Sequence, residues 1–257
     1  MRIGILKTDS VRAEFQGEFG DYPAMFRAML IASADDIPLE FRDYDVQCGE
    51  YPESLDECHA YLITGSRHSV YDDQPWIHRL AQFVHELDAA KHPLVGICFG
   101  HQLVAHALGG ETRAADVGWA VGVHETVVIS PEAWMLPYRE RFGLLSSHKD
   151  QVVKLPDRAE VFASTPLCPN SGFTIDEHIL TFQAHPEFAK GYARALIEMR
   201  KDLLGEPRYE AGLASLSQAI HPSLIGRWII NFVAAHAAKQ TTTRAMDRAT
   251  GAIDQAR

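Results

Sequence analysis

The sequence predicts an α/β fold in which helices cover both faces of a mostly parallel, open sheet. Short apolar runs that are typical of buried strands alternate with longer segments whose apolar residues recur at helical spacing. This alternation favours a parallel sheet, because parallel strands are joined by crossovers that usually contain a helix. From about residue 111 to residue 182 the chain changes to short β-type runs, which predict a small antiparallel flank.

The first part of the chain supplies the alternating elements. Apolar runs predict strands over Arg2–Lys7, Leu39–Tyr44 and Ala60–Thr64. Helical spacing predicts helices over Tyr22–Ala34 and Pro75–Lys91. The second helix is the clearer of the two, because proline suits the first turn of a helix and the apolar residues lie on one face.

The later part of the chain supplies the flank and further helices. Val121–Ile129 and Glu160–Ala163 are β-type runs. After them, Tyr192–Leu204 and His221–Ala238 carry apolar residues at helical spacing, so we expect two helices that pack on the core.

These elements predict one domain over residues 1–239, followed by a mobile tail over residues 240–257, where a threonine run gives way to mixed charges. The acidic and aromatic stretch Glu14–Tyr22 contains two glycines and is interpreted as a loop. This loop either covers the functional site as a lid or is an ordinary surface loop.

Cys98 occupies the most informative position in the chain. The apolar run Pro93–Ile97 predicts a buried strand, and the residues after Gly100 have helical spacing until Gly109-Gly110 stops them. Cys98 therefore lies on a sharp strand-to-helix turn, where flanking glycines permit strained dihedral angles. The positive end of a helix dipole favours a thiolate. We expect Cys98 to be a nucleophile; the alternative is a small buried residue in a tight turn.

A nucleophilic cysteine usually works with an imidazole that a third group orients. The run Ile179–Phe182 predicts a strand that leads to His185-Pro186-Glu187. In extended chain, residues two apart project to the same side, so His185 and Glu187 can address each other and one cleft. Alternatively, they form a surface ion pair at a strand exit.

Composition narrows the class of protein. The 257 residues carry a formal net charge of −10 and no block of Lys or Arg, which argues against a nucleic-acid surface. The 4 cysteines lack metal-type spacing. A free thiol on a turn needs a reducing compartment, and neither a signal peptide nor a membrane-spanning run is evident, so we expect a cytoplasmic protein without membrane contacts.

Two motifs resemble the class I, or triad, glutamine amidotransferase family. The segment Gly96-Ile97-Cys98-Phe99-Gly100-His101-Gln102 matches the cysteine motif of that family, and His185-Pro186-Glu187 matches its second motif. Ser147-His148-Lys149-Asp150-Gln151-Val152 resembles a segment of the GMP-synthase-like branch, to which the γ-glutamyl peptidases are related. The resemblance covers roughly the first 190 residues, a length that one such domain is expected to fill. Arg67 and Ala184 depart from the pattern of the family, close to the expected pocket.

The resemblance implies a flavodoxin-like fold and a division of roles among the matched residues. Cys98 would attack the γ-carbonyl of a glutamyl amide and form a thioester, His185 would shuttle the proton, and Glu187 would hold the imidazole ring. Backbone N–H groups of Phe99 and of Gly65 or Ser66 would form the oxyanion hole. The substrate-binding residues would be Gln102, Ser147 and His148. No metal or other cofactor is implied.

Three functions remain open on the sequence alone. The chain could hydrolyse glutamine and pass ammonia to a synthetase partner, hydrolyse γ-glutamyl peptides or conjugates, or serve as a non-catalytic binding protein on this scaffold. The intact set of Cys98, His185 and Glu187 argues against the third. An α/β-hydrolase is a poorer match, because its acid normally precedes the histidine in the chain.

Overall fold

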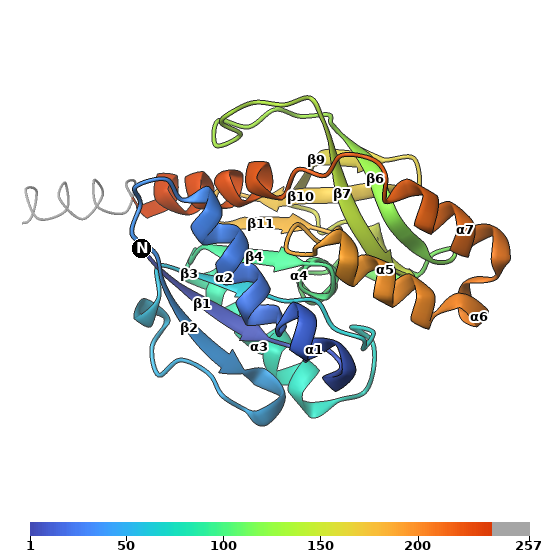
Figure 1. Ribbon diagram of the computed structural model, residues 1–257. Coiled ribbons are helices and arrows are strands. Elements are labelled where there is room, and N and C mark those ends of the chain that lie inside the picture. The colour runs from blue at the N-terminus through green and yellow to red at the C-terminus, as the bar shows by residue number, and fades with distance from the viewer. Residues whose placement is uncertain (238–257) are drawn as a thin grey trace, which may run out of the picture.

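The computed structural model describes residues 1–237, and within them a mixed sheet of nine strands runs through the molecule (Figure 1). Five neighbouring strands are parallel. In sheet order they are β2 (Glu40–Asp45), β1 (Arg2–Lys7), β3 (Ala60–Ile63), β4 (Leu94–Ile97) and β11 (Ile179–Phe182). The predicted α/β class and the mostly parallel sheet are confirmed.

The other four strands continue the sheet in antiparallel fashion. They are β10 (Cys168–Ile175), β9 (Ala159–Thr165), β6 (Ala120–Val128) and β7 (Arg141–His148). A separate antiparallel pair joins β5 (Glu111–Ala114) to β8 (Asp150–Lys154). The predicted change to short antiparallel strands after about residue 111 is therefore confirmed.

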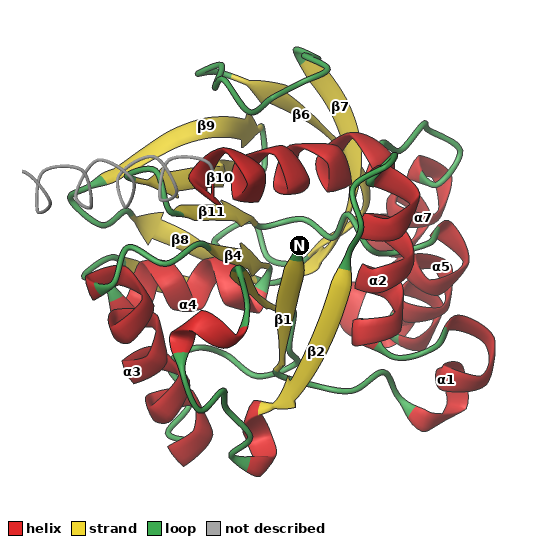
Figure 2. Cartoon of the chain, turned by 90° about the vertical axis from the view of Figure 1, so that its left-hand side faces the viewer, coloured by secondary structure: helices red, strands yellow, loops and turns green. Residues whose placement is uncertain are grey.

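Helices cover both faces of the parallel strands, as Figure 2 shows for α3 and α4 on one side and α2 on the other. Their bounds are α2 (Tyr22–Ser33), α3 (Pro75–Ala89) and α4 (Phe99–Ala107). A helix over residues 222–237 packs beside α2 on the same face. The last residue of the expected His221–Ala238 helix, and the predicted tail over residues 240–257, lie outside the described residues.

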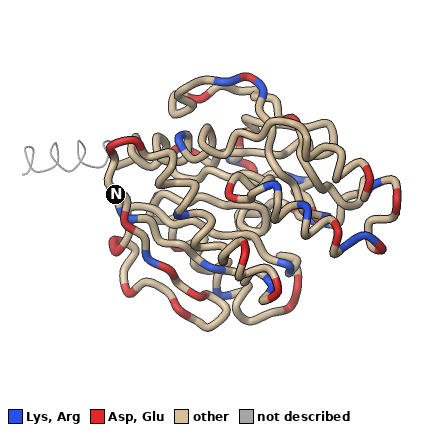
Figure 3. Tube along the Cα trace, in the orientation of Figure 1, with Lys and Arg blue, Asp and Glu red and all other residues tan. Residues whose placement is uncertain are grey.

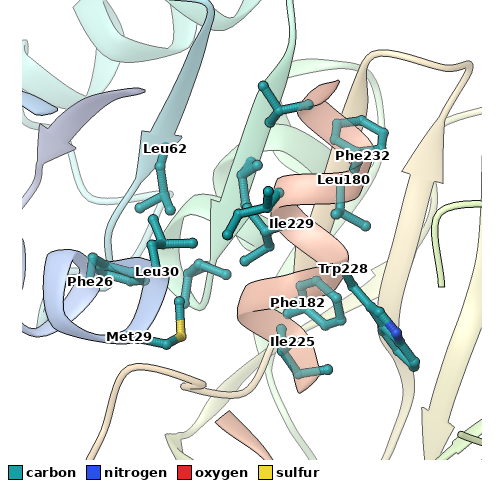
Figure 4. Packing of buried hydrophobic residues seen from close by; sticks show 14 of the residues in the cluster. Phe26, Met29, Leu30, Leu62, Leu180, Phe182, Ile225, Trp228, Ile229 and Phe232 are labelled. Carbon is teal, nitrogen blue, oxygen red and sulfur yellow. The ribbon is translucent and has the colours of Figure 1, made fainter. Parts of the chain in front are cut away.

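The core beneath α2 and the 222–237 helix is dense with large apolar side chains (Figure 4). Trp228 and Phe26 have no exposed surface, and Phe182 of β11 is only 1% exposed. Each such side chain contributes about 1.5–3 kcal/mol when it leaves water. This layer fixes β4 and β11, the two strands whose ends carry the candidate catalytic residues.

The C-terminal half of the chain adds three further helices. The helices α5 (Lys190–Met199) and α7 (Glu206–Ser215) pack against the antiparallel strands β6 and β7, and α6 (Lys201–Leu204) packs against α5 and α7. A single helix over Tyr192–Leu204 was expected, but the helix breaks at Arg200, whose φ is −101° and ψ is 15°.

The expectation of a loop over Glu14–Tyr22 is wrong. Residues Ala13–Phe19 form the short helix α1, which ends at Gly20 with a φ of 76°. Phe15 and Phe19 place their rings 6.4 and 5.5 Å from that of Tyr192, so α1 packs on α5. These aromatic contacts offset the cost of Gly17, which weakens the helical pattern in the sequence.

Two short 3₁₀ turns, Val46–Cys48 and Leu55–Glu57, connect the strands β2 and β3. Basic and acidic residues are interspersed along the described chain (Figure 3). Among residues 1–237, no helix combines the length and the apolar character that crossing a membrane requires.

Candidate active site

Cys98 lies on a strained turn between β4 and α4. Its φ is 52° and its ψ is −98°, a region that residues with a side chain rarely adopt. Its N–H donates to the carbonyl of Phe182 (2.8 Å), and its carbonyl accepts from the N–H of Gln102 (3.0 Å). These bonds hold the strained residue between the sheet and the helix. The predicted strand-to-helix turn is confirmed.

The two glycines of this turn are required by packing. An ideal Cβ on Gly96 would lie 2.7 Å from the backbone of Gly100, and one on Gly100 would lie 2.6 Å from the carbonyl oxygen of Ile63. Because α4 begins at Phe99, two residues before the expected start, the N–H of Phe99 belongs to the first turn. The first N–H groups of a helix have no partner within it.

His185 and Glu187 form a buried pair at the end of β11. The Nδ1 atom of His185 lies 2.8 Å from Oε1 of Glu187, and the two side chains are 5% and 0% exposed. The ring of Phe188 stacks on the imidazole at 3.9 Å with an angle of 12° between the planes. The alternative of a surface ion pair is wrong, because both groups are buried.

The surroundings of His185 favour its protonated form. Burial opposes the charge, but the negative charges of Glu187 and Cys98 outweigh burial and raise the pKa of His185 to about 10.

Gly65 lies between the cysteine and the histidine. An ideal Cβ on Gly65 would lie 2.8 Å from Cε1 of His185 and 3.6 Å from Cβ of Cys98. The hydroxyl of Thr8 donates to the carbonyl of Gly65 (2.8 Å), and Asp9 accepts from the N–H of Arg67 (2.9 Å). The residues just after β1 therefore hold the loop around Gly65 and Ser66, in which the second oxyanion donor is predicted.

A cleft of about 460 Å³ opens beside Cys98. Four other predicted site residues line it, namely Ser66, Gln102, Ser147 and His148. The side chains of His185 and Glu187 are buried and are not part of this lining. The fold therefore brings the predicted substrate-binding residues to the same cleft as the cysteine.

The three predicted substrate-binding side chains are already held by the protein. Nε2 of Gln102 donates to the carbonyl of Asp150 at 2.7 Å. Ser147 accepts a hydrogen bond from Arg200 at 2.8 Å. Burial, together with the nearby His185, lowers the pKa of His148 to about 3, so its imidazole is neutral at neutral pH.

Several residues of the cleft were not foreseen from the sequence as substrate contacts. Asp9 is buried, and its carboxylate pairs with the guanidinium of Arg67 at 2.6 Å. Arg67, which departs from the family pattern, therefore has a buried partner. Trp119, Tyr192 and Arg200 also line the cleft. These residues lie outside both motifs, and only the fold brings them to the site.

Another cluster of metal-binding residue types lies at the opposite end of β11. Asp88, Asp176 and His178 place ligand atoms close together. Lys91 approaches Asp176 at 2.9 Å, and Arg158 approaches Asp88 at 2.6 Å. These cations already neutralise the carboxylates, so the cluster is an ion-pair network.

A mixed α/β sheet with a cysteine on a strand-to-helix turn, beside a buried histidine–carboxylate pair, has the arrangement of hydrolytic enzymes with a cysteine nucleophile. The family model described as glutamine amidotransferase class-I matches residues 32–200. The chain belongs to the class-I glutamine amidotransferase family.

Individual relatives agree with this family. A glutamine amidotransferase-like protein of Schizosaccharomyces pombe is 32% identical over 209 residues, which cover 77% of this chain and 83% of the relative. Gamma-glutamyl peptidase 2 of Arabidopsis thaliana is 30% identical over 155 residues, 58% of this chain and 62% of the relative. A GMP synthase of Porphyromonas gingivalis is 30% identical over 157 residues, 59% of this chain and 30% of that protein.

Solved structures match the fold. The crystal structure of a glutamine amidotransferase from Thermotoga maritima superposes with a TM-score of 0.68 at 21% identity, and the match covers 91% of this chain and 98% of that one. The fold of this chain is therefore that of the amidotransferase domain.

Proposed function

We propose that this protein hydrolyses the γ-amide bond of γ-glutamyl compounds, with Cys98 as the nucleophile. One observation carries the proposal: Gly65 has both Cys98 and His185 as immediate neighbours, and His185 in turn pairs with buried Glu187. Of these groups, Cys98 lines a cleft that a small molecule can enter.

The chemistry follows from the roles of these groups. The thiolate of Cys98 adds to the γ-carbonyl carbon, and negative charge develops on the carbonyl oxygen. The N–H groups of Phe99 and of Gly65 or Ser66 receive that charge; the loss of one such donor typically costs a factor of about 10² to 10³ in rate.

His185 then completes both halves of the reaction. Its imidazolium gives a proton to the leaving nitrogen, the carbon–nitrogen bond breaks, and a γ-glutamyl thioester remains on Cys98. The now neutral imidazole takes a proton from water, whose oxygen attacks the thioester. The products are glutamate, the freed amine or ammonia, and the regenerated thiolate. Glu187 keeps the imidazole in the orientation that both proton transfers need.

The size of the cleft favours γ-glutamyl peptides or conjugates over glutamine. A volume of about 460 Å³ is greater than a single amino acid fills, and the similarity to Gamma-glutamyl peptidase 2 points the same way. A second candidate is release of ammonia from glutamine to a synthetase partner, which the similarity to a GMP synthase supports. Because a reactive thiol needs reducing conditions, we expect the protein to act in the cytoplasm.

The test measures glutamate release by the purified chain from glutamine and from γ-glutamyl dipeptides. Cys98→Ser removes the nucleophile, and Cys48→Ser, which changes an exposed thiol outside the cleft, is the matched control. Peptide turnover that is lost only in Cys98→Ser supports the hydrolase. Turnover of glutamine alone supports the ammonia donor, and activity that survives Cys98→Ser overturns the proposal.

A further inference from the structure

Arg200 differs from the other cations that line the cleft. Arg67 is paired with the carboxylate of Asp9, while the side chains of Arg12 and Lys149 are exposed to water. Arg200 is half-buried, and none of the described carboxylates forms an ion pair with it. A cation that has lost much of its water and has no counterion is costly unless a ligand supplies one.

The guanidinium of Arg200 is held in place by two groups that carry no charge. It lies over the indole ring of Trp119 at 4.9 Å, and one of its nitrogens donates to the hydroxyl of Ser147 at 2.8 Å. A guanidinium has five N–H donors arranged in a planar fork. Stacking and one hydrogen bond fix that plane and leave further donors available for a ligand in the cleft.

The position of Arg200 in the fold explains how it reaches the cleft. It stands at the break between α5 and α6, where its φ of −101° and ψ of 15° depart from helical values. Arg200 and Cys98 line the same cleft, so the cation faces the space that a substrate of the nucleophile occupies. A substrate whose γ-carbonyl reaches Cys98 can therefore place a second group near Arg200.

We propose that Arg200 is a specificity-determining residue that recognises a carboxylate of the substrate. Arginine matches a carboxylate because two parallel N–H groups can bind its two oxygens. The proposal rests on the proposed function, since it concerns the same cleft and a γ-glutamyl ligand. A γ-glutamyl dipeptide offers this chemistry at two places, the α-carboxylate of its glutamyl group and the C-terminal carboxylate of its amine half.

The test measures binding in the Cys98→Ala protein, in which no turnover can occur. Three ligands are titrated by calorimetry: γ-glutamylglycine, its C-terminal carboxamide and its α-carboxamide. Arg200→Gln should weaken the binding of γ-glutamylglycine about tenfold or more, because a charge-assisted hydrogen bond is lost. Arg200→Lys keeps the charge but not the planar fork, so its affinity for γ-glutamylglycine should lie between the affinities with Arg200 and with Arg200→Gln. Arg194→Gln, which changes an exposed arginine on α5, is the matched control.

The ligands distinguish recognition from a structural role. One of the two carboxamides lacks the carboxylate that Arg200 recognises. Its affinities for the proteins with and without the Arg200→Gln substitution should agree within about twofold. The identity of that carboxamide shows which carboxylate Arg200 holds. Its unchanged binding also shows that the variant is folded. Equal weakening of all three ligands, or no weakening of γ-glutamylglycine, overturns the proposal.

Turnover separates this proposal from the proposed function. If γ-glutamylglycine binds with the expected dependence on Arg200 but the wild-type protein releases no glutamate from it, the proposed hydrolase activity is overturned and the proposed role of Arg200 stands. If turnover is normal and Arg200→Gln binds all ligands normally, only the role of Arg200 is overturned. If none of the three ligands binds, both proposals fall.

Discussion

The N–H of His185 donates a hydrogen bond to the carbonyl of Leu145 at 2.8 Å. Leu145 belongs to β7, which is the last strand of the sheet order, whereas His185 follows β11 in the middle of it. The antiparallel half of the sheet therefore curls back until its outer strand meets the end of β11. This closure brings Ser147 and His148, which follow Leu145 in β7, to the rim of the cleft.

Glu187→Gln should lower kcat by about 10² to 10⁴-fold, because the charge that stabilises the imidazolium is lost while the shape of the pair is kept. KM should change much less, since Glu187 does not line the cleft. Steady-state kinetics on a γ-glutamyl dipeptide measure both constants. Glu198→Gln, at an exposed position on α5, is the control, and a kcat equal to that of this control would contradict the role of Glu187.

The difference in stability between wild type and Glu187→Gln should depend on pH in a defined direction. The pKa of His185 is about 10 in the folded protein and 6.5 in the reference state, so its protonation stabilises the fold fully below pH 6.5. That contribution is lost as the pH rises towards 10. The gap in melting temperature between wild type and Glu187→Gln should be largest near pH 6 and should narrow towards pH 10. A gap that widens with pH would show that His185 is not charged.

Gly65→Ala should reduce activity more than it reduces stability. The new Cβ would lie 2.8 Å from Cε1 of His185, so the imidazole must move away from Cys98. We expect kcat to fall by about 10²-fold, because small displacements of catalytic groups are costly. Gly17→Ala, where a Cβ meets no atom within 4 Å, should leave kcat unchanged. A fully active Gly65→Ala protein would show that His185 is not confined there.

Gly100→Ala should destabilise the fold. Its Cβ would lie 2.6 Å from the carbonyl oxygen of Ile63, a backbone atom that cannot rotate away. Overpacking of this kind typically costs about 1–3 kcal/mol in the free energy of unfolding. Urea denaturation measures this difference, and Gly17→Ala, in the middle of α1, should instead gain about 0.5–1 kcal/mol. Equal stability of wild type and Gly100→Ala would mean that the turn adjusts its backbone.

The strand-to-helix turn at Cys98 could be predicted from the sequence because its signals are local. Glycines, an apolar run and a helical pattern all lie within a few residues of the cysteine. The pairing of His185 with Glu187 could be predicted for the same reason, since alternation along a strand places both on one side.

The rest of the site depends on contacts between distant segments. Nothing local connects Arg200 to Ser147 until the sheet has closed through Leu145 and His185. Asp9 meets Arg67 only because the strands that precede them, β1 and β3, pair in the sheet. The helix α1 could not be predicted because Gly17 breaks its pattern, and its stability comes from packing on Tyr192.

The most direct measurement of the central claim is the mass of the protein during turnover. The chain is mixed with a γ-glutamyl dipeptide, quenched with acid within the first turnovers and digested for mass spectrometry. The account predicts one added glutamyl group on the peptide that contains Cys98, which disappears when the substrate is exhausted and never forms in Cys98→Ser. Release of glutamate without that adduct, or an adduct on another residue, would contradict it.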